Sequence, residues 1–486
     1  MRLALLYIAL LSACAPAAYR APEVKVPPAF RERLDSLAPA ALTAPTKSAA
    51  DAQQGVARVP VVSSDSTASI DRHWRDLNDT TLDRLLDQAL RGNLDVEVAR
   101  TRIRGARAAR AGASLDFAPT VTAIGGYTRQ RIASASFPIS TGSFPDQDIW
   151  DAGFDASWEI DLFGRVRSDV RGRGALVNAA EQELRNVRVS LAAELARVYF
   201  ELRGAQEQLA VAQRNAENQR RTLVLTRERL DAGCGTAFDT ERAQAQLSFT
   251  LASVPSFEAR VAAAQYRLGV LAGRPPSDVA PELRTVAAIP ALPPTVAIET
   301  PDSIIRRRPD VAAAERRVAA EHSFVGSAKA EYFPRLDVGG SAGYTSADAD
   351  RLGGRGTFRY AVGPIISWPA LNLGRVKASV DGARAREAEA RAQYDQTVLF
   401  ALEEVETALV TYRTSLNRAS RVGDAAAASA RAAELARMRF TGGVTDFLQV
   451  LDAERTQLES EDLLARARTD AAVSYAALYK ALGGER

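Results

Sequence analysis

The sequence contains almost no residues of the kind that build metal sites or disulfide frameworks. Cys14 and Cys234 are the only cysteines, and His73 and His322 the only histidines, among 486 residues. No two of these four are spaced like metal ligands, and two isolated cysteines do not make a disulfide framework. Glycine-rich phosphate loops and nucleophile elbows are also missing from the sequence, which therefore predicts neither a bound cofactor nor an enzyme.

Long apolar runs and a strong net charge are absent as well. No apolar run reaches the roughly 18 residues that a transmembrane helix needs, so a membrane-crossing chain of this kind would have to form a closed β-barrel. The formal net charge is only +3, so no basic field indicates nucleic-acid binding. Aromatic residues make up 7% and hydrophobic residues 47%, a mixture typical of long helices with thin packed seams.

The first residues are similar to a bacterial lipoprotein signal. A short apolar stretch, Leu3–Leu11, leads into Leu11-Ser12-Ala13-Cys14. These features predict a signal peptide over residues 1–13 and lipidation of Cys14, because several acyl chains on one cysteine give stable membrane anchoring. The alternative is an ordinary secretory signal with an incidental cysteine. Residues 14–73, rich in Pro, Ala, Ser and Thr, are predicted to form the lipid anchor and an extended tether.

After the tether, the sequence carries one pattern twice. Trp158-Glu-Ile-Asp-Leu-Phe-Gly-Arg165 resembles Trp368-Pro-Ala-Leu-Asn-Leu-Gly-Arg375 at an offset of 210 residues. The pairs Ala118-Pro119 and Phe333-Pro334, each followed by a glycine-rich run, are offset by 215 residues. Each copy predicts the order helix, strand, strand, very long helix, helix, which indicates an internal duplication. The predicted organisation is a first structural repeat over 74–274, a proline-rich linker over 275–301 and a second structural repeat over 302–484.

Four segments alternate between apolar and polar residues, as membrane strands do. The clearest begins at Trp150, where even positions are apolar and odd positions are Asp, Gly, Ser or Glu. The others lie near 120–128, 336–345 and 358–368. Their length and their terminal aromatic residues favour transmembrane strands. The predicted membrane-interface aromatics are Tyr127, Trp150, Trp158, Tyr344 and Trp368. A soluble antiparallel sheet with one wet face gives the same alternation and is the alternative.

Four strands are too few to close a membrane barrel, since known barrels start at about eight strands. The chain must therefore oligomerise, giving eight strands as a dimer or twelve as a trimer. The residues alone leave both possibilities open.

Heptad spacing follows each pair of strands. Apolar residues recur every seven positions between Leu195 and Leu230, and the second copy repeats the pattern from Val398 to Leu416. Such a seam predicts long helices packed side by side. A helix over 167–231 would be roughly 95–100 Å long, too long for a compact domain and about right for crossing much of a periplasm. A coiled-coil filament or an adaptor hairpin would show the same seam.

Residues 74–484 resemble the outer membrane factor family of TolC-like channels, specifically its lipid-anchored multidrug efflux branch (OprM/NodT-like). Besides the Trp158–Arg165 motif, Ile305-Arg-Arg-Arg-Pro-Asp-Val311 and Gly443-Val-Thr-Asp-Phe-Leu-Gln-Val-Leu-Asp452 carry the resemblance. It implies an α+β membrane protein: a homotrimer whose four strands per protomer form a 12-stranded β-barrel, continued by a long α-helical barrel. It also implies an outer-membrane location with a periplasmic extension, a periplasmic adaptor as partner, and an inner-membrane pump of the RND type.

The resemblance also places two helix–turn–helix tips, at Leu230–Thr240 and Phe440–Leu451. Asp239 and Asp452 match the carboxylates of the family's periplasmic gate, where three copies around an axis would repel one another and attract cations. For Asp239, a simple helix N-cap is an equally good alternative. The turns need backbone freedom. Four glycines at the adaptor-contacting tips are expected to supply it: Gly233, Gly235, Gly442 and Gly443.

The predicted function is therefore an outer-membrane exit duct that conducts substrates passively from an adaptor and a pump to the exterior. A periplasmic coiled-coil adaptor and a structural lipoprotein are the alternatives. The duplication argues against an adaptor with a single hairpin. A purely structural coiled coil would leave the four alternating strands unexplained.

Overall fold

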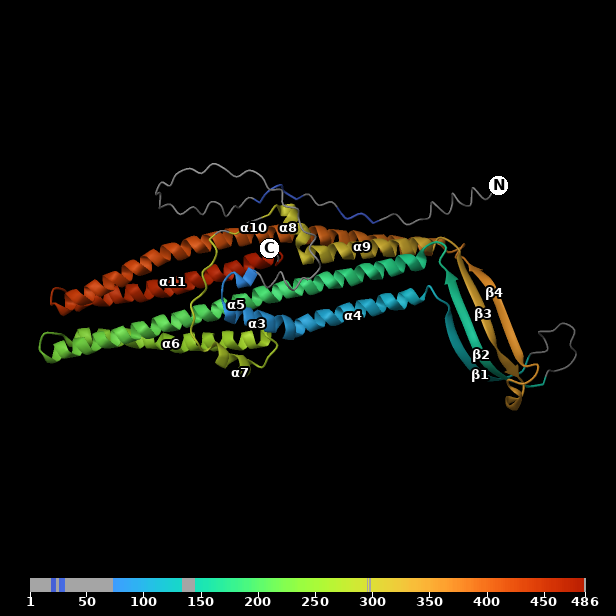
Figure 1. Cartoon of the computed structure of the whole chain (residues 1–486), viewed down its shortest axis with the longest axis horizontal. Coiled ribbons are helices and arrows are strands. Elements are labelled where there is room, and N and C mark those ends of the chain that lie inside the picture. Colours follow the sequence, from blue (N-terminus) through green and yellow to red (C-terminus); the bar gives the residue numbers. More distant parts are fainter. Residues whose placement is uncertain are drawn as a thin grey trace. The chain divides into compact units, whose positions relative to one another are not determined.

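The computed structural model describes residues 19–22, 26–30, 73–132, 145–294, 296 and 299–484. The predicted signal peptide, Cys14 and most of the tether lie outside these residues. Within them the chain is rich in helix and contains a small antiparallel sheet, which is the α+β class expected (Figure 1). Its elements in chain order are α3 (Thr80–Gly92), α4 (Leu94–Leu115), β1 (Thr120–Gln130), β2 (Gln147–Ile160), α5 (Arg165–Asp231), α6 (Ala237–Leu271), α7 (Pro276–Val279), η3 (Ala280–Leu283), α8 (Pro301–Arg307), α9 (Pro309–Ala330), β3 (Arg335–Ser346), η4 (Ala349–Arg351), β4 (Phe358–Ser367), α10 (Leu373–Thr441) and α11 (Phe447–Ala481).

The order of elements repeats along the chain as the sequence predicts. Helices lead into the hairpin β1–β2, the long helix α5 and then α6; the second copy runs through β3–β4, α10 and α11. Helices α5 and α10 contain 67 and 69 residues, about 100 Å each at 1.5 Å per residue. They end at Asp231 and Thr441, which are 210 residues apart, the offset found in the sequence.

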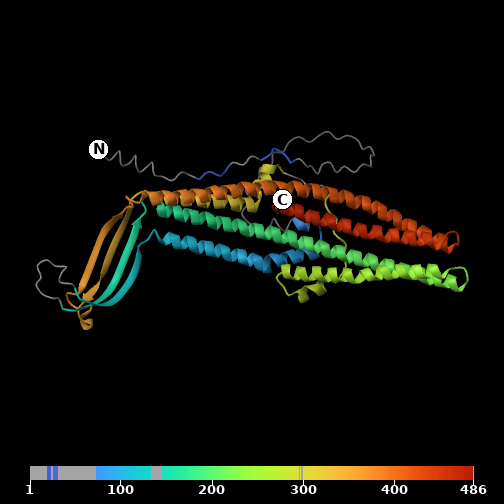
Figure 2. The same ribbon diagram turned by 180° about the vertical axis from the view of Figure 1, so that it is seen from behind.

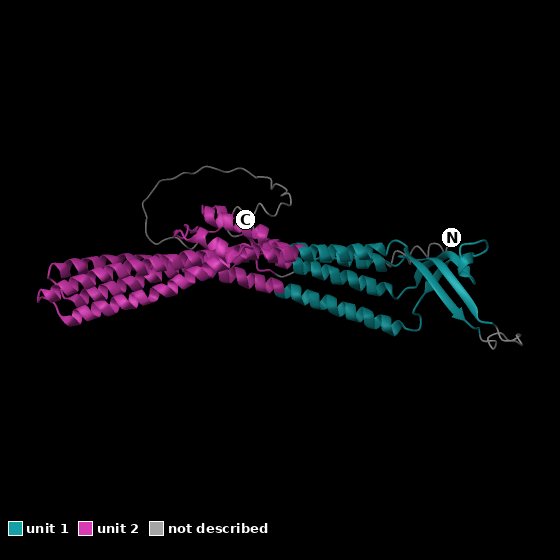
Figure 3. Ribbon diagram, turned by 90° about the horizontal axis from the view of Figure 1, so that it is seen from below, with its two compact units in different colours: residues 1–24, 101–182, 312–396 teal, residues 25–100, 183–311, 397–486 magenta. Residues whose placement is uncertain are grey.

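The chain divides into two compact units, and each takes segments from both copies (Figure 3). One unit comprises residues 1–24, 101–182 and 312–396 and contains all four strands. The other comprises residues 25–100, 183–311 and 397–486. A single copy of the repeat is therefore not a compact body by itself.

The strand-bearing unit is organised by one four-stranded sheet in the order β1-β2-β3-β4, with every neighbouring pair antiparallel. The two hairpins have the same register once the repeat offsets are applied. Thr120 pairs with Ser157, and the residues at the corresponding places in the second copy, Arg335 and Ser367, also pair. β1 and β4 are the two edges of this sheet.

The all-helical unit is built from two antiparallel hairpins, the paired parts of α5 and α6 and of α10 and α11 (Figure 2). Its core is aromatic as well as aliphatic, with Trp74, Tyr199 and Tyr412 fully buried. Part of the predicted linker packs into this core: Leu283 is fully buried, and its carbonyl accepts hydrogen bonds from Gln206 and Gln265.

Across the described residues, no helix is both long enough and apolar enough to cross a membrane.

Candidate functional site

The residue pairing of the sheet puts the predicted apolar positions on one face. Directly paired residues of antiparallel strands share a face. Val121 pairs with Ala156, Phe154 with Ala342, and Ala342 with Tyr360. Val121, Phe154 and Tyr360 are all exposed in the single chain. The alternation in the sequence thus becomes an exposed apolar surface that extends across all four strands.

Aromatic residues gather where β1 and β2, and β3 and β4, approach their connecting loops. Tyr127 pairs with Trp150, and their ring centroids lie 4.6 Å apart. In the second copy the aromatic pair lies two residues nearer the loop than the equivalent place, where Tyr344 pairs with Phe358, with centroids 5.7 Å apart. This end of the apolar face therefore carries an aromatic pair from each copy.

Two tryptophans occupy the opposite end of the strands, next to the long helices. The indole Nε1 of Trp158 donates to the Phe117 carbonyl at 2.9 Å, and that of Trp368 donates to the Tyr332 carbonyl at 3.0 Å. Trp368 lies 210 residues after Trp158, and Tyr332 lies 215 residues after Phe117, so the two hydrogen bonds are equivalent in the repeat. Each indole is fixed by its N–H while much of its apolar ring stays exposed, the arrangement suited to a membrane interface.

The other face of the sheet is polar and carries an ion-pair network that the sequence did not reveal. Arg359 on β4 donates to both carboxylate oxygens of Asp151 on β2, at 2.6 and 2.9 Å. Thr345 on β3 donates to Asp151 at 2.5 Å and accepts from Arg359 at 2.8 Å. The three residues come together only through the register of three strands, so no local sequence signal identifies them.

The two helical tips have the same backbone structure. Gly233 and Gly443 both adopt left-handed conformations, with φ of 73° and 72°. Each helix end closes with the paired hydrogen bonds of a Schellman motif. These bonds run from Gly233 N to Leu230 O and Cys234 N to Arg229 O in one tip, and from Gly443 N to Phe440 O and Val444 N to Arg439 O in the other, at 2.9–3.0 Å.

The other two tip glycines do not have the role that we predicted. Neither Gly235 nor Gly442 has a positive φ, so neither supplies left-handed backbone freedom. Gly235 is required for another reason, since a Cβ there would lie 2.9 Å from the Leu230 nitrogen. At Gly442 the nearest atom to an added Cβ would be the Met438 oxygen at 3.4 Å, a contact that requires little adjustment.

The predicted gate carboxylates lie on different hairpins, each near the start of the helix after a tip. Asp239 is the third residue of α6, and its Oδ2 accepts a 2.7 Å hydrogen bond from Thr236. The N-cap of α6 is Thr236, so the alternative that Asp239 is the cap is wrong. Asp452 on α11 is 70% exposed, and Arg455 lies 3.5 Å away. The acidic N-cap in this tip is Asp446.

Sequence reasoning missed Glu454, a carboxylic acid buried behind the tips. Its side chain is 4% exposed and joins three helices. Thr222 on α5 donates to Glu454 Oε1 at 3.0 Å, and Arg437 on α10 lies 3.5 Å from the same oxygen. Burial raises the pKa of Glu454 above its ordinary value, although Thr222 and Arg437 oppose this effect.

Replacing Glu454 by glutamine should raise the stability of the chain near neutral pH, because the charged form is the one that burial disfavours. A raised pKa in the folded chain means that stability is lost as the pH rises from the ordinary glutamate pKa through the folded one. The gain should therefore vanish below about pH 4. Thermal melts of both proteins between pH 4 and 8 would test this, and a constant difference across the range would contradict it.

The structure combines three features: a duplicated hairpin, an exposed apolar strand face, and long helices that end in matched tips. A comparison with known protein families identifies one family to which these features belong. Residues 85–274 and 300–484 match the family described as outer membrane efflux protein. The chain belongs to this family. The identification confirms the family, the fold class, the efflux-channel function and the outer-membrane location predicted from the sequence.

Individual members of the outer membrane efflux protein family match nearly the whole chain. The probable efflux pump outer membrane protein TtgC of Pseudomonas putida is 30% identical over 457 residues, covering 92% of both proteins. Outer membrane protein OprJ of Pseudomonas aeruginosa is 31% identical over 416 residues, covering 84% of both. Among solved structures, the outer-membrane channel OprN matches with a TM-score of 0.84 and 35% identity, covering 97% of this chain and 99% of that one.

As a member of this family, the protein is an outer-membrane channel of a tripartite efflux system, with a helical extension on the periplasmic side. The exposed apolar strand face and the paired helical tips therefore belong to a channel protein.

Proposed function

We propose that three copies of this chain close into a 12-stranded barrel continued by a helical barrel, through which efflux substrates pass without chemical change. The observation that supports this most directly is the sheet, which has two open edges and an exposed apolar face. Open edges present unpaired backbone groups, which barrel closure satisfies. Four strands per chain make twelve in a trimer.

The internal repeat also predicts which residues pair between subunits. Within the chain, Ala156 on β2 pairs with Gly340 on β3. Adding 210 to the first and subtracting 215 from the second gives Ile366 on β4 and Gly125 on β1 of the next copy. This register keeps the apolar residues of β4 and β1 on the same side of the barrel, since Ile366 and Gly125 both belong to the apolar face.

Disulfide formation between subunits tests the trimer. In a Cys234→Ser background, Gly125→Cys combined with Ile366→Cys should give covalent trimers on oxidation. An added side chain at Gly125 meets no atom of its own chain within 4 Å. The control is Gly126→Cys with Ile366→Cys: Gly126 is equally unobstructed, but its side chain would point to the polar face. A product that ends at the dimer, or equal linkage in the control, would refute the proposed closure.

We further propose that Asp239 and Asp452 form the periplasmic gate and that the tip turns contact a periplasmic adaptor linked to an RND-type pump. The two aspartates flank the tips, and Asp452 is exposed while Asp239 is half-buried. A ring of carboxylates in a narrow pore favours cations. Replacing Asp452 by asparagine, alone or with Asp239→Asn, should lower the cation preference measured in planar bilayers.

Glu459→Gln provides the matched control for the gate experiment, because Glu459 is 69% exposed on the same helix. Its replacement should leave ion selectivity as in the wild type. If Glu459→Gln changes selectivity as much as Asp452→Asn does, the gate lies elsewhere. If the pure trimer conducts no ions at all, the channel proposal itself fails.

Lipidation of Cys14 completes the proposal. The acyl chains would sit beside a barrel that already spans the membrane, so the lipid acts as an accessory anchor. Metabolic labelling with a fatty acid should mark the wild type and not Cys14→Ser. Label retained by Cys14→Ser would show that the N-terminal motif is an ordinary secretory signal.

A further inference from the structure

The two places where a strand leads into a long helix are equivalent in the repeat, but they differ in charge. We call residues 159–167 the first junction and residues 369–377 the second. In the first, Glu159 binds the Arg165 guanidinium through both oxygens, with a shortest distance of 2.6 Å. Asp161 accepts the backbone N–H groups of Val166 and Arg167 at 3.2 and 2.9 Å. Both the arginine and the start of α5 are thus neutralised within the first copy.

The second junction keeps the arginine and loses both carboxylates. Arg375 corresponds to Arg165, but Pro369 and Leu371 stand where Glu159 and Asp161 would be. Among the described residues, no carboxylate lies within ion-pair distance of Arg375, and none caps the first N–H groups of α10. A free guanidinium beside an uncapped helix start is a place where an anion is stabilised.

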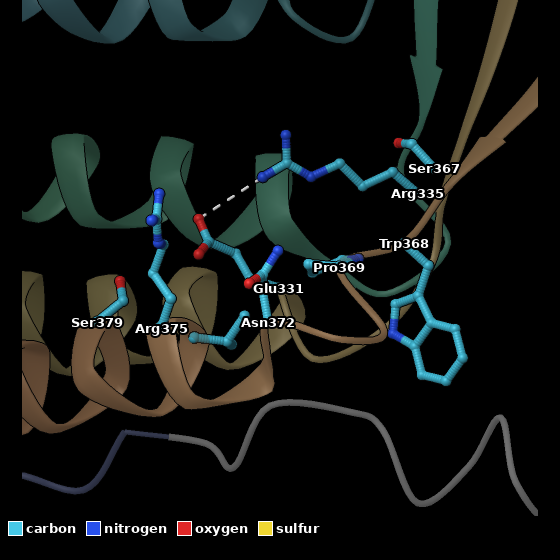
Figure 4. A pocket seen from close by; sticks show the side chains of 9 residues that line it. Glu331, Arg335, Ser367, Trp368, Pro369, Asn372, Arg375 and Ser379 are labelled. Atoms are coloured by element: carbon cyan, nitrogen blue, oxygen red, sulfur yellow. Dashed lines mark ion pairs between the residues drawn. The ribbon is translucent and has the colours of Figure 1, made fainter.

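A cleft of about 570 Å³ opens at this second junction, with Arg335 and Arg375 in its lining (Figure 4). Arg335 replaces the neutral Thr120 of the first copy and therefore adds a further positive charge. Glu331 is the acidic residue of the lining, and it lies 3.6 Å from Arg335. One carboxylate thus faces two guanidinium groups, so the cleft has an excess of positive charge.

The margin of the cleft is apolar. Trp368 lines it and is 52% exposed, and the nearby Leu371 is 99% exposed. Both adjoin the apolar face of β4, where Ile366 is also exposed. An anion-binding cleft next to exposed apolar side chains fits a ligand with a charged head and an acyl chain.

We infer that the second junction binds an anionic glycerophospholipid, with its phosphate at Arg375 and Arg335 and an acyl chain against Trp368 and Leu371. The inference rests on the proposed function because it requires the apolar strand face to meet lipid. Phosphate groups suit arginine, whose planar fork of donors matches the geometry of phosphate oxygens. The first junction has no such capacity, since its own carboxylates already occupy the arginine and the helix start.

The internal repeat also indicates which residues of a neighbouring subunit would approach the second junction. At the first junction, two aromatic residues of the second copy pack against the start of α5: Phe333 stacks on Phe163 with centroids 4.7 Å apart, and Phe324 lies against Gly172. In the proposed trimer, Ala118 and Ala109 of the next subunit would take these two positions. The neighbouring subunit would thus present two small side chains to α10 at the places where α5 meets two rings.

Native mass spectrometry of the detergent-solubilised protein with added phosphatidylglycerol tests the inference. The wild type should retain about one phosphatidylglycerol per chain and should not retain phosphatidylcholine in its place. Arg375→Gln should weaken retention about tenfold, as expected for losing one strong charge-assisted contact. Arg384→Gln is the control, because Arg384 is an exposed arginine further along α10 and should behave as wild type.

A second variant copies the first junction into the second and guards against misfolding. Pro369→Glu with Leu371→Asp supplies the two carboxylates that bind Arg165 and the start of α5 in the first junction. This variant should no longer retain phosphatidylglycerol, while the mass of the trimer is unchanged apart from the substitutions. Equal retention of phosphatidylglycerol by wild type and both variants would overturn the inference. So would displacement of the lipid by an equal concentration of glycerol phosphate, which has no acyl chain. Because lipids are counted per chain, a failure to trimerise appears separately in the same spectrum.

Discussion

Replacing Arg308 by methionine is expected to lower the free energy of unfolding by about 3 kcal/mol or more, because it breaks a buried charge cluster, leaving Asp310 without its cation and Glu404 with Lys480 alone. The Arg308 side chain is only 6% exposed. Its guanidinium donates to Asp310 at 2.8 Å, to Glu404 at 2.6 Å and to the Ala481 carbonyl at 2.6 Å. One side chain thus joins the start of α9, the middle of α10 and the end of α11.

Arg308 is the last of three consecutive arginines, Arg306 to Arg308, and the first of them supplies the control. Arg306, two residues earlier, is 79% exposed and pairs with Asp302, one turn away on the same helix. Arg306→Met should change stability by less than about 0.5 kcal/mol, as for other exposed ion pairs. Chemical denaturation followed by circular dichroism would compare the two. If both variants unfold at the same denaturant concentration, Arg308 does not have the role described.

The same cluster predicts a pH dependence. Burial tends to raise the pKa of Glu404, but hydrogen bonds from Arg308 and Lys480 outweigh it and lower the pKa. A lowered pKa in the folded chain stabilises it above the ordinary glutamate pKa, and this contribution is lost as the pH falls through the folded value. The penalty of Arg308→Met should therefore shrink below about pH 4. A penalty that grows in acid would contradict this assignment.

The sequence predicts those parts of the fold that follow from local periodicity. The alternation around Trp150 specified a strand face, and the register of the sheet places the same residues on that face. Heptads predicted a helix over 167–231, and α5 begins only two residues earlier. Both patterns repeat every few residues along one segment, so no knowledge of distant partners is needed.

What the sequence did not reveal depends on partners that are far apart in the chain. Arg308 was recognised within a family motif, but its contacts with Glu404 and Ala481 arise only when separate helices pack. Glu454 lies in a polar stretch of α11, and only the approach of α5 and α10 buries it. The identity of the α6 cap was missed for a local reason, since Thr236 comes first and takes the cap position.

Gly204→Ala is expected to destabilise the chain by about 2 kcal/mol, although alanine is the better helix former. Gly204 lies in α5 where it meets α11. A Cβ added there would clash with Thr469 Oγ1 and would lie 2.9 Å from Thr469 Cβ. Rotating the Thr469 side chain moves its oxygen but not its Cβ, so the two helices have to separate. Overpacking of this kind costs more than the roughly 1 kcal/mol that alanine gains in helix propensity.

Gly423→Ala on α10 is the control that separates the effect of a steric clash from the effect of helix propensity. A Cβ added at Gly423 has its nearest neighbour, Leu464 Cδ1, at an ordinary distance of 3.8 Å. Gly423→Ala should therefore be neutral or stabilising in the same denaturation experiment. The double variant Gly204→Ala with Thr469→Gly places the glycine on α11 instead of α5. It removes the clash and should therefore restore part of the stability. Equal effects of alanine at Gly204 and Gly423, or no recovery with Thr469→Gly, would show that close packing of α5 on α11 does not require glycine at this position.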